Sequence, residues 1–344
     1  MFSERVDNYR WLEADRKSKI LVYVTGDRQG METQISSDAL EYFSDHLDKI
    51  GKVEKISLVL YTRGGDTMAA WSLVNLVRQY CKSFEVIIPS KARSSGTIIC
   101  LGADSIIMTK QATLGPIDPS VNGSLNPQNP QEPNNPAARV PVSVESIQGF
   151  IELAKKEFNL THKSDLKEIL LNLSDKVHPL VLGNVYRSRA QIQMVARKLL
   201  NKQLGEENKY KIDKIITFLC SDSGSHDYAI YRNEAKDELG LNIQKPNDEQ
   251  YSIIASIFED IRAELKLLQP FTPNFEIGNS DRADYTCRRV LIESINGGTD
   301  VLLTDGTLSK TTQNIPQPPH LPPVQRTLIE NQMNFEGWRH EDNS

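Results

Sequence analysis

The chain has 344 residues, 39% of them hydrophobic and 25% charged, with 40 basic and 45 acidic residues and a net charge of −5. This balance gives no electrostatic reason to expect a nucleic-acid partner or binding to an anionic membrane surface. No apolar run approaches the roughly 18 residues of a membrane span, and the N-terminal residues lack the apolar segment of a secretory signal, which predicts a cytoplasmic protein without a membrane span.

Short apolar runs alternate with segments of helical spacing in the first third of the chain. Residues 1–18 carry charged side chains throughout and predict a polar lead-in. Strands are expected at 20–25, 56–61, 84–88 and 105–108, and helices at 36–50, at 67–80 and from near Ser94 onward. Buried strands that alternate with helices predict βαβ units and a mainly parallel sheet.

An Asn- and Pro-rich segment at 121–141 interrupts this pattern and predicts a surface loop, because proline excludes both a helix interior and a central strand. Beyond it, helices are expected at 144–158, 164–173, 177–200, 233–239 and 247–268, a strand at 215–220, a hairpin whose strands 288–296 and 300–303 flank Gly297–Gly298, and an extended tail that contains 317–323. A chain of this length exceeds one ordinary core. We therefore divide it into the lead-in 1–18, a domain at 19–244 and a C-terminal part at 245–344.

Two segments at strand-to-helix turns carry candidate chemistry. They are YTRGGD at 61–66 and KARSSGT at 91–97. A glycine pair lets backbone N–H groups point outward, and a serine at the start of a helix lies near free N–H groups and the positive end of the helix dipole. Together they could supply a nucleophile and oxyanion donors, although each segment alone fits a tight turn or a helix cap equally well.

Several longer strings occur in the order known from one family. GGDTMAAWSLVNLVRQY at 64–80, SKARSSGTIICLGADSIIM at 90–108, TLGPIDPS at 113–120 and HPLVLGNVYRSR at 178–189 resemble the serine dehydrogenase proteinases, a branch of the Clp-fold serine peptidases related to signal peptide peptidase A. The resemblance covers roughly residues 18–243. It implies an α/β fold, a Clp protease/crotonase-like spiral of βαβ units with a mainly parallel sheet, to which this chain adds a C-terminal helix and β-hairpin.

The resemblance also implies a nucleophile and an oxyanion hole. In Clp peptidases the nucleophile precedes a small residue and a glycine, which here selects Ser94, with Ser95 as the fallback. The oxyanion donors of that family correspond to the backbone N–H groups of Gly65 and Ser95.

The general base departs from the family pattern. Clp peptidases have a histidine after the serine and an aspartate much later along the chain, whereas this chain has Asp118 at the first place and His226-Asp227 at the second. We expect a triad of Ser94, His226 and Asp118, with Asp227 as an alternative carboxylate, because triads are defined by geometry and not by chain order.

Other bases remain open at this stage. His178 precedes Pro179 at a helix start and is the alternative imidazole, and Lys176 would form a Ser–Lys dyad as in signal peptide peptidase A. The remaining histidines are expected to be solvent-exposed: His46, His162, His320 and His340. No HExxH motif and no Cys/His cluster supports a metal site.

The resemblance predicts a serine-type peptidase that hydrolyses peptide bonds through an acyl-enzyme, without a cofactor. Its substrate would be a peptide or protein, it would assemble as a homo-oligomer (a trimer, hexamer or larger ring), and any unfoldase would be a separate partner. Two alternatives stay open. One is an inactive Clp-fold scaffold or binding subunit, because the usual histidine is missing, and the other is a crotonase-type acyl-CoA enzyme, which has an oxyanion hole but no serine nucleophile.

Overall fold

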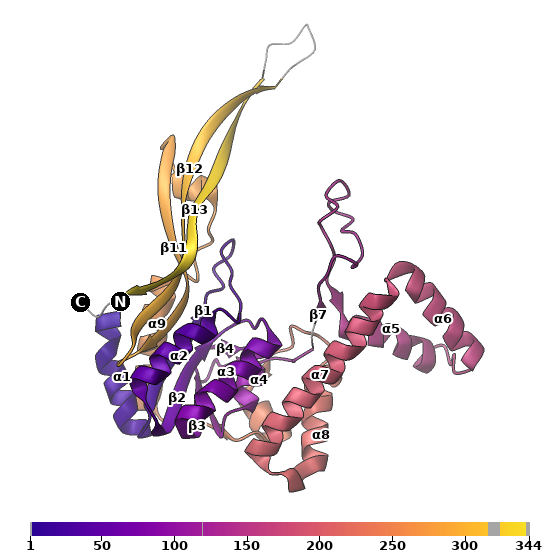
Figure 1. The fold of residues 1–344 in the computed structure, drawn as a ribbon, viewed down its shortest axis with the longest axis horizontal. Coiled ribbons are helices and arrows are strands. Elements are labelled where there is room, and N and C mark those ends of the chain that lie inside the picture. The colour runs from indigo at the N-terminus through magenta and orange to yellow at the C-terminus, as the bar shows by residue number, and fades with distance from the viewer. Residues whose placement is uncertain (1, 119, 316–323, 342–344) are drawn as a thin grey trace.

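An eight-stranded sheet forms the centre of the computed structural model, which describes residues 2–118, 120–315 and 324–341 (Figure 1). Its strand order is β10-β5-β3-β2-β1-β11-β12-β13. The first five of these strands are mutually parallel, and the last three are antiparallel. The strands are β1 (Lys19–Thr25), β2 (Val53–Tyr61), β3 (Cys81–Ile88), β5 (Ser105–Met108), β10 (Ile243–Gln244), β11 (Arg282–Ser294), β12 (Gly298–Ile315) and β13 (Val324–Glu341).

Helices cover both faces of the sheet, as the alternation of side chains along β1 shows. Leu21 and Tyr23 pack with α2 (Ala39–Ile50), α3 (Thr67–Tyr80) and α4 (Ser95–Leu101). Ile20 and Val22 point the other way, toward α1 (Phe2–Arg16) and α9 (Asp248–Glu264). A strand covered on both faces has no polar side, which explains its continuous apolar sequence.

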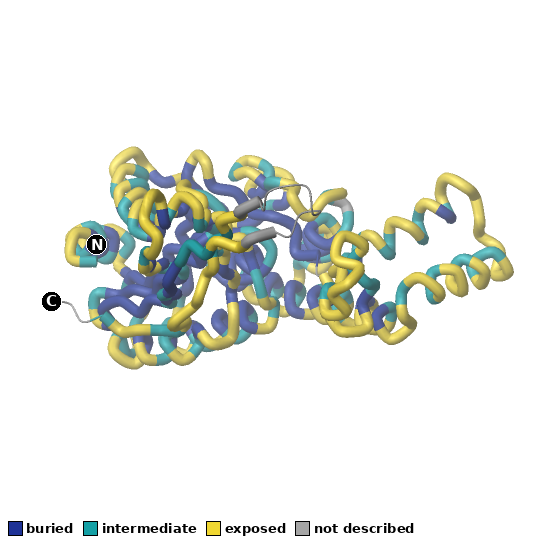
Figure 2. The backbone as a smooth tube through the Cα atoms, turned by 90° about the horizontal axis from the view of Figure 1, so that it is seen from above, coloured by how far each residue is buried: buried dark blue, intermediate teal, exposed yellow. Residues whose placement is uncertain are grey.

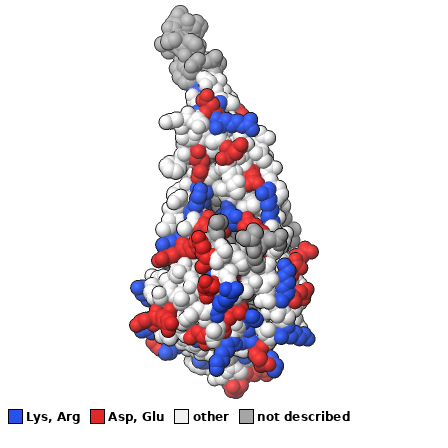
Figure 3. All heavy atoms as spheres, turned by 90° about the vertical axis from the view of Figure 1, so that its left-hand side faces the viewer, with Lys and Arg blue, Asp and Glu red and all other residues white. Residues whose placement is uncertain are grey.

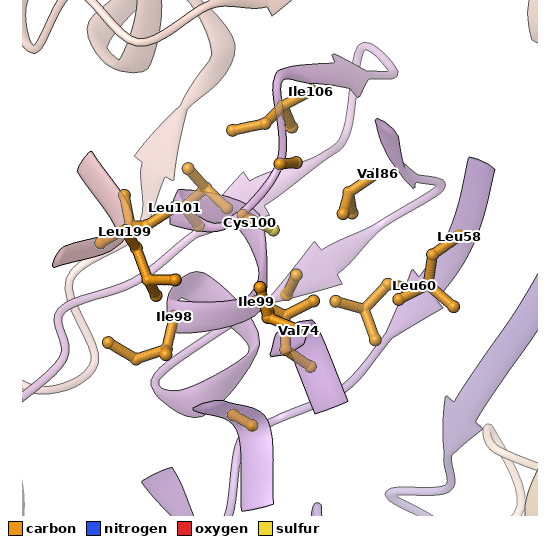
Figure 4. Packing of buried hydrophobic residues seen from close by; sticks show 14 of the residues in the cluster. Leu58, Leu60, Val74, Val86, Ile98, Ile99, Cys100, Leu101, Ile106 and Leu199 are labelled. Atoms are coloured by element: carbon orange, nitrogen blue, oxygen red, sulfur yellow. The ribbon is translucent and has the colours of Figure 1, made fainter. Parts of the chain in front are cut away.

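The short helix α4 is buried over its whole length. Ile98, Ile99 and Leu101 are fully buried and lie among side chains of β3, β5 and α7 (Pro179–Leu204) (Figure 4). A helix held on all sides by core contacts cannot shift, so its first residue has a fixed place at the end of the sheet.

The predicted α/β class with a mainly parallel sheet, a C-terminal helix and a hairpin is confirmed. The helix at 67–80 and the strand at 105–108 have their predicted bounds. The loop predicted at 121–141 lies between the short paired strands β7 (Ser120–Val121) and β8 (Val142–Ser143). The C-terminal hairpin is much longer than predicted, and the predicted extended tail includes β13. Residues 317–323 lie outside the described residues.

Two predicted elements are wrong. The supposed lead-in is the helix α1, which buries Arg5, Tyr9 and Leu12 against α9 and the sheet. Charged residues are interspersed along this helix, and one of them, Arg5, is buried because it forms ion pairs with the distant carboxylates of Glu264 and Glu293. The supposed strand at 215–220 belongs to α8 (Lys209–Thr217) and the π-helical turn η2 (Phe218–Asp222). A short apolar run does not distinguish a strand from a buried helix.

Two parts project from this body. The helices α5 (Val144–Lys156) and α6 (Lys163–Lys176) extend to one side beside α7, and they are largely exposed; α6, which is described throughout, has no buried residue (Figures 1 and 2). The β12–β13 hairpin extends away from the body in another direction (Figure 1). On the face seen in Figure 3, acidic and basic side chains are interspersed over the body and the hairpin.

Candidate active site

Two loops lie side by side where β2 and β4 (Lys91–Ala92) end. The Thr62 N–H donates to Lys91 O (3.0 Å), and the Arg93 N–H donates to Thr62 O (3.2 Å). These two bonds hold the glycine pair next to the turn that carries Ser94. The strand β4 in turn pairs with β6 (Thr113–Leu114), which leads to Asp118.

Ser94 has a strained backbone conformation, with φ 52° and ψ −118°. Residues other than glycine rarely adopt a positive φ. Holding one in this backbone conformation costs about 1–3 kcal/mol of stability. The turn is held by hydrogen bonds from Gly96 N to Arg93 O and from Thr97 N to Ser94 O, each 2.8 Å long. Although Ser94 stands at the N-cap of α4, its side chain makes no capping hydrogen bond. Ser94, which is partly exposed as a residue, therefore does not use its hydroxyl as a helix cap.

The glycine pair is needed because both backbones are in close contact with their neighbours. A Cβ at Gly64 would lie 2.6 Å from Ser94 Cβ and 3.1 Å from Ser94 Oγ, and a Cβ at Gly65 would lie 2.3 Å from Ile35 O. Both glycines also have a positive φ, 115° and 146°. A side chain at Gly64 would push this backbone away from Ser94, and a side chain at Gly65 would push it away from Ile35.

The two expected oxyanion donors are tied together. The Ser95 hydroxyl donates to Gly65 O. Among the described residues, neither the Gly65 N–H nor the Ser95 N–H donates a hydrogen bond, and Ser95 is the first residue of α4, where N–H groups have no partner within the helix. Because Ser95 is 1% exposed and its hydroxyl is engaged, it is a poor nucleophile compared with its neighbour Ser94.

The structure brings Asp118 and His226 together. His226 Nδ1 lies 2.7 Å from Asp118 Oδ1, and the aspartate is buried whereas 52% of the His226 side chain is exposed. The hydrogen bond to Asp118 is the main cause that raises the pKa of His226 above its ordinary value of 6.5, and Arg93 lowers that pKa by a smaller amount. The bond occupies Nδ1 and leaves Nε2 for another partner.

The contact between the imidazole and the serine is not made. Within the described part of the chain, Ser94 Oγ has no hydrogen bond to His226. Arg93, the residue before Ser94, lies close to Gly115 in the segment that carries Asp118, so the serine turn and the Asp118–His226 pair lie on neighbouring segments. The geometry thus contains an oriented acid–imidazole pair and, near it, a strained serine beside free backbone donors.

The alternative bases occupy other positions. Asp227 raises the His226 pKa, but among the described residues it has no hydrogen bond to the ring. His178 is the N-cap of α7 and accepts from Leu180 N (3.2 Å). Lys176 ends α6, so both residues lie at the α6–α7 junction in the projecting part and not at the end of the sheet (Figure 1).

Sequence reasoning missed two supporting residues. The Thr97 hydroxyl donates to Gly115 O (2.8 Å) and accepts from Gly115 N (3.1 Å), which ties α4 to the segment that carries Asp118. Ile35 pairs with the glycine loop through Ile35 N to Gly64 O and Asp66 N to Ile35 O, each 2.8 Å long. Neither residue has a local signal, because these contacts join segments far apart in the chain.

One expected exposure is wrong. His46 is 1% exposed, and its ring nitrogens lie 2.7 Å from Ser294 Oγ and 3.0 Å from Asp300 Oδ2. Its helix position looks polar in the sequence, but strands from the C-terminal part cover it. His320 lies outside the described residues.

The comparison with family models supports the class that this fold and site define. Residues 44–136 match the model of a family described as ClpP-like SDH-type serine proteinases. The match confirms the predicted resemblance, and with the mainly parallel sheet it gives the protein a ClpP-like fold. The matched segment contains Gly65, Ser94 and Asp118 but ends before His226.

Two uncharacterized proteins of Methanocaldococcus jannaschii are each 28% identical to the chain, over 208 and 188 residues. The matches cover 60% and 55% of this chain, and they span 60% and 51% of the relatives' own lengths.

Solved structures give weaker similarities. ClpP1 from Listeria monocytogenes is 13% identical, with a TM-score of 0.35 and coverage of 70% of this chain and 99% of that chain. A variant of the 1510-N membrane-bound stomatin-specific protease, in complex with a substrate peptide, is 14% identical, with a TM-score of 0.25 and coverage of 66% and 94%. None of the described helices is both long and apolar enough to cross a membrane.

Proposed function

We propose that the chain is a serine peptidase of the Clp fold that hydrolyses peptide bonds through an acyl-enzyme on Ser94. The observation that carries this proposal is the backbone of Ser94, which is strained and leaves the hydroxyl without a capping role. Strain at a single polar residue is a feature of functional sites, since surrounding structure has to maintain it. The family match over residues 44–136 supports a Clp-fold peptidase in general.

In the proposed reaction, Ser94 Oγ attacks the carbonyl carbon of the scissile bond and passes its proton to His226 Nε2. The backbone N–H groups of Gly65 and Ser95 stabilise the negative charge that develops on the carbonyl oxygen. The imidazolium then gives its proton to the leaving amine, and water releases the acyl group by the same route in reverse. Asp118 accepts from Nδ1–H throughout, which fixes the ring and the tautomer.

This reaction requires His226 Nε2 to come within hydrogen-bond distance of Ser94 Oγ. His226 lies on an exposed segment between η2 and β9 (Ile230–Tyr231), so a movement of the ring would not disturb the core. Catalytic hydrogen bonds often shorten only when substrate is bound. We propose that the bond between Ser94 and His226 likewise forms when substrate binds. We further propose that the substrate is a peptide or protein, that the peptidase domain is 19–244, and that the protein is a cytoplasmic homo-oligomer.

The second candidate is an inactive Clp-fold scaffold or binding subunit. The specific observation in its favour is the missing hydrogen bond between Ser94 and His226. In that case the strain at Ser94 would have no catalytic use.

A fluorophosphonate probe separates the two candidates. The intact protein should be labelled on Ser94, as located by peptide mass spectrometry, and labelling should disappear in Ser94→Ala. Ser174→Ala is the matched control, because that serine lies on the exposed helix α6 and its hydroxyl donates to Leu170 O of the same helix. If the wild-type protein is not labelled in any assembly state, the peptidase proposal fails and the scaffold is favoured.

A further inference from the structure

Arg93, immediately before Ser94, differs from the other arginines whose Nε is buried without a hydrogen-bond partner. There are three of these among the described residues, Arg78, Arg93 and Arg189. Arg78 still forms two hydrogen bonds with Asp104 (2.7 and 2.9 Å), and Arg189 donates to Gln148 and Ser221. The Arg93 side chain has no hydrogen bond and no ion pair within the described part of the chain.

The backbone and the stem of Arg93 determine where its guanidinium goes. Its N–H donates to Thr62 O and its carbonyl accepts from Gly96 N, so the residue cannot turn. A Cβ at Gly115 would lie 3.2 Å from both Cβ and Cγ of Arg93. The stem therefore runs along the segment that carries Asp118, and the absence of a side chain at Gly115 leaves room for it. Its effect on the His226 pKa agrees with this direction.

No carboxylate among the described residues forms an ion pair with Arg93. Asp118 is the acid in this segment, and its Oδ1 is bonded to His226. A partly buried cation without a partner is unfavourable unless something else pairs with it. A guanidinium has five donors in a planar fork that fits a carboxylate with two parallel hydrogen bonds. The group that best fits Arg93 is therefore a carboxylate from outside the chain.

We propose that Arg93 binds a carboxylate of the peptide substrate beside the scissile bond, an inference that rests on the proposed peptidase function. The carboxylate belongs either to an Asp or Glu side chain or to the C-terminus of the peptide. In both cases Arg93 is a substrate-binding residue that selects acidic sites and holds the carbonyl over Ser94.

Paired peptides test this selectivity. In a defined mixture of synthetic peptides, each position is occupied by Glu in one peptide and by Gln in its pair. Every peptide is present both with a free C-terminal carboxylate and as the C-terminal amide, and cleavage is followed by mass spectrometry. We expect the wild-type protein to prefer the acidic member of one pair, which also identifies the source of the carboxylate. Arg93→Gln should reduce kcat/KM for that member by about 10- to 100-fold and leave the neutral member little changed. Arg93→Lys should retain part of the preference.

Two further arginines serve as matched controls. Arg63 is exposed and lies just before the glycine pair, and Arg187 is exposed on α7. Arg63→Gln and Arg187→Gln should keep the acid preference. If Arg63→Gln removes it as completely as Arg93→Gln does, the effect comes from the general field of the site and the proposal of a direct contact is wrong.

Binding to Ser94→Ala keeps the result independent of catalysis. Fluorescence anisotropy should show that the acidic peptide binds more tightly than its neutral pair, and that Arg93→Gln in the same background removes the difference. Equal binding of both peptides overturns the role of Arg93, even if the wild-type protein cleaves peptides. Missing fluorophosphonate labelling, in contrast, overturns only the peptidase function. Thermal denaturation confirms that each variant is folded.

Discussion

Two sets of serine, histidine and aspartate residues in the described part of the chain have opposite surroundings, and only in one of them does the serine contact the histidine. One is the candidate site with Ser94, His226 and Asp118, where the serine is strained and partly exposed and the imidazole is half exposed. The other joins Ser294, His46 and Asp300, where the serine and the histidine are each 1% exposed.

In the buried set, the polar side-chain atoms of Ser294 and His46 are engaged in hydrogen bonds within the fold. Both nitrogens of His46 have partners, and Ser294 Oγ also accepts from Gly297 N (2.9 Å). A Cβ at Gly297 would lie 2.1 Å from His46 Nδ1, so no substrate could enter. This group ties α2 to the turn between β11 and β12. The comparison shows that three residue types within reach of one another do not make a catalytic site; a reachable hydroxyl, a free ring nitrogen and unused N–H donors are also needed.

Removing each histidine gives the largest contrast. His226→Ala should reduce the rate of fluorophosphonate labelling by about 10⁴-fold, because the serine loses its base, and should leave the fold intact. His46→Ala should leave labelling of the folded protein unchanged but destabilise the fold by roughly 1–3 kcal/mol, since Ser294 and Asp300 lose a buried partner. Labelling kinetics and thermal denaturation measure the two effects. Loss of labelling in a stable His46→Ala protein would contradict the assignment.

Asp118→Asn tests how the carboxylate acts on the imidazole. The rate should fall by about 10³- to 10⁴-fold, because the ring loses its orientation and tautomer. The pKa of wild-type His226 is raised, so its activity should decline as the pH falls through that raised value and the imidazole is protonated. In the variant this acidic limb should move to lower pH. A pH–rate profile with an unchanged acidic limb is the outcome that speaks against Asp118.

The hydrogen bond between His226 and Asp118 should also make the stability of the protein depend on pH. A folded pKa above the unfolded value stabilises the protein below the unfolded pKa, and this contribution is lost as the pH rises through the folded pKa. The stability difference between wild type and Asp118→Asn should therefore be larger at pH 5 than at pH 9. Denaturation at both values measures it.

Ser294→Ala should affect stability alone. It leaves His46 Nδ1 without its buried partner, at a cost of roughly 1–3 kcal/mol, whereas the Gly297 N–H keeps its hydrogen bond to Ser294 O. Labelling of Ser94 in the folded protein should be unaffected. If Ser294→Ala removes labelling while Ser94→Ala does not, the roles of the two groups are reversed.

The smallest expected effect concerns strain. Ser94→Gly should abolish labelling, because the nucleophile is gone. It should also stabilise the fold by about 1 kcal/mol, because glycine adopts a positive φ readily and the relief of backbone strain exceeds the extra conformational entropy that glycine loses on folding. Ser94→Ala is the matched control, since alanine keeps the strain and should give no such gain. Equal unfolding free energies for Ser94→Gly and Ser94→Ala would show that the backbone at position 94 is not strained.

Sequence patterns predicted what depends on neighbours along the chain. The helix at 67–80 and the strand at 105–108 follow from apolar periodicity, and the glycine pair and the serine turn were visible as motifs. The patterns failed where distant partners decide. Burial of Arg5 depends on Glu293, and burial of His46 depends on Ser294 and Asp300, none of which is near in sequence.

By itself, the sequence determined the βαβ class, the family resemblance and the two turns that meet at the candidate site, because these rest on local spacing and backbone needs. Tertiary structure alone decided three things. It placed His226 on Asp118, it left the Arg93 side chain beside Ser94 without a hydrogen-bond partner among the described residues, and it buried the second set of Ser, His and Asp residues. The physical reason is that ion pairs, hydrogen bonds and exposure are set by contacts between segments far apart in the chain.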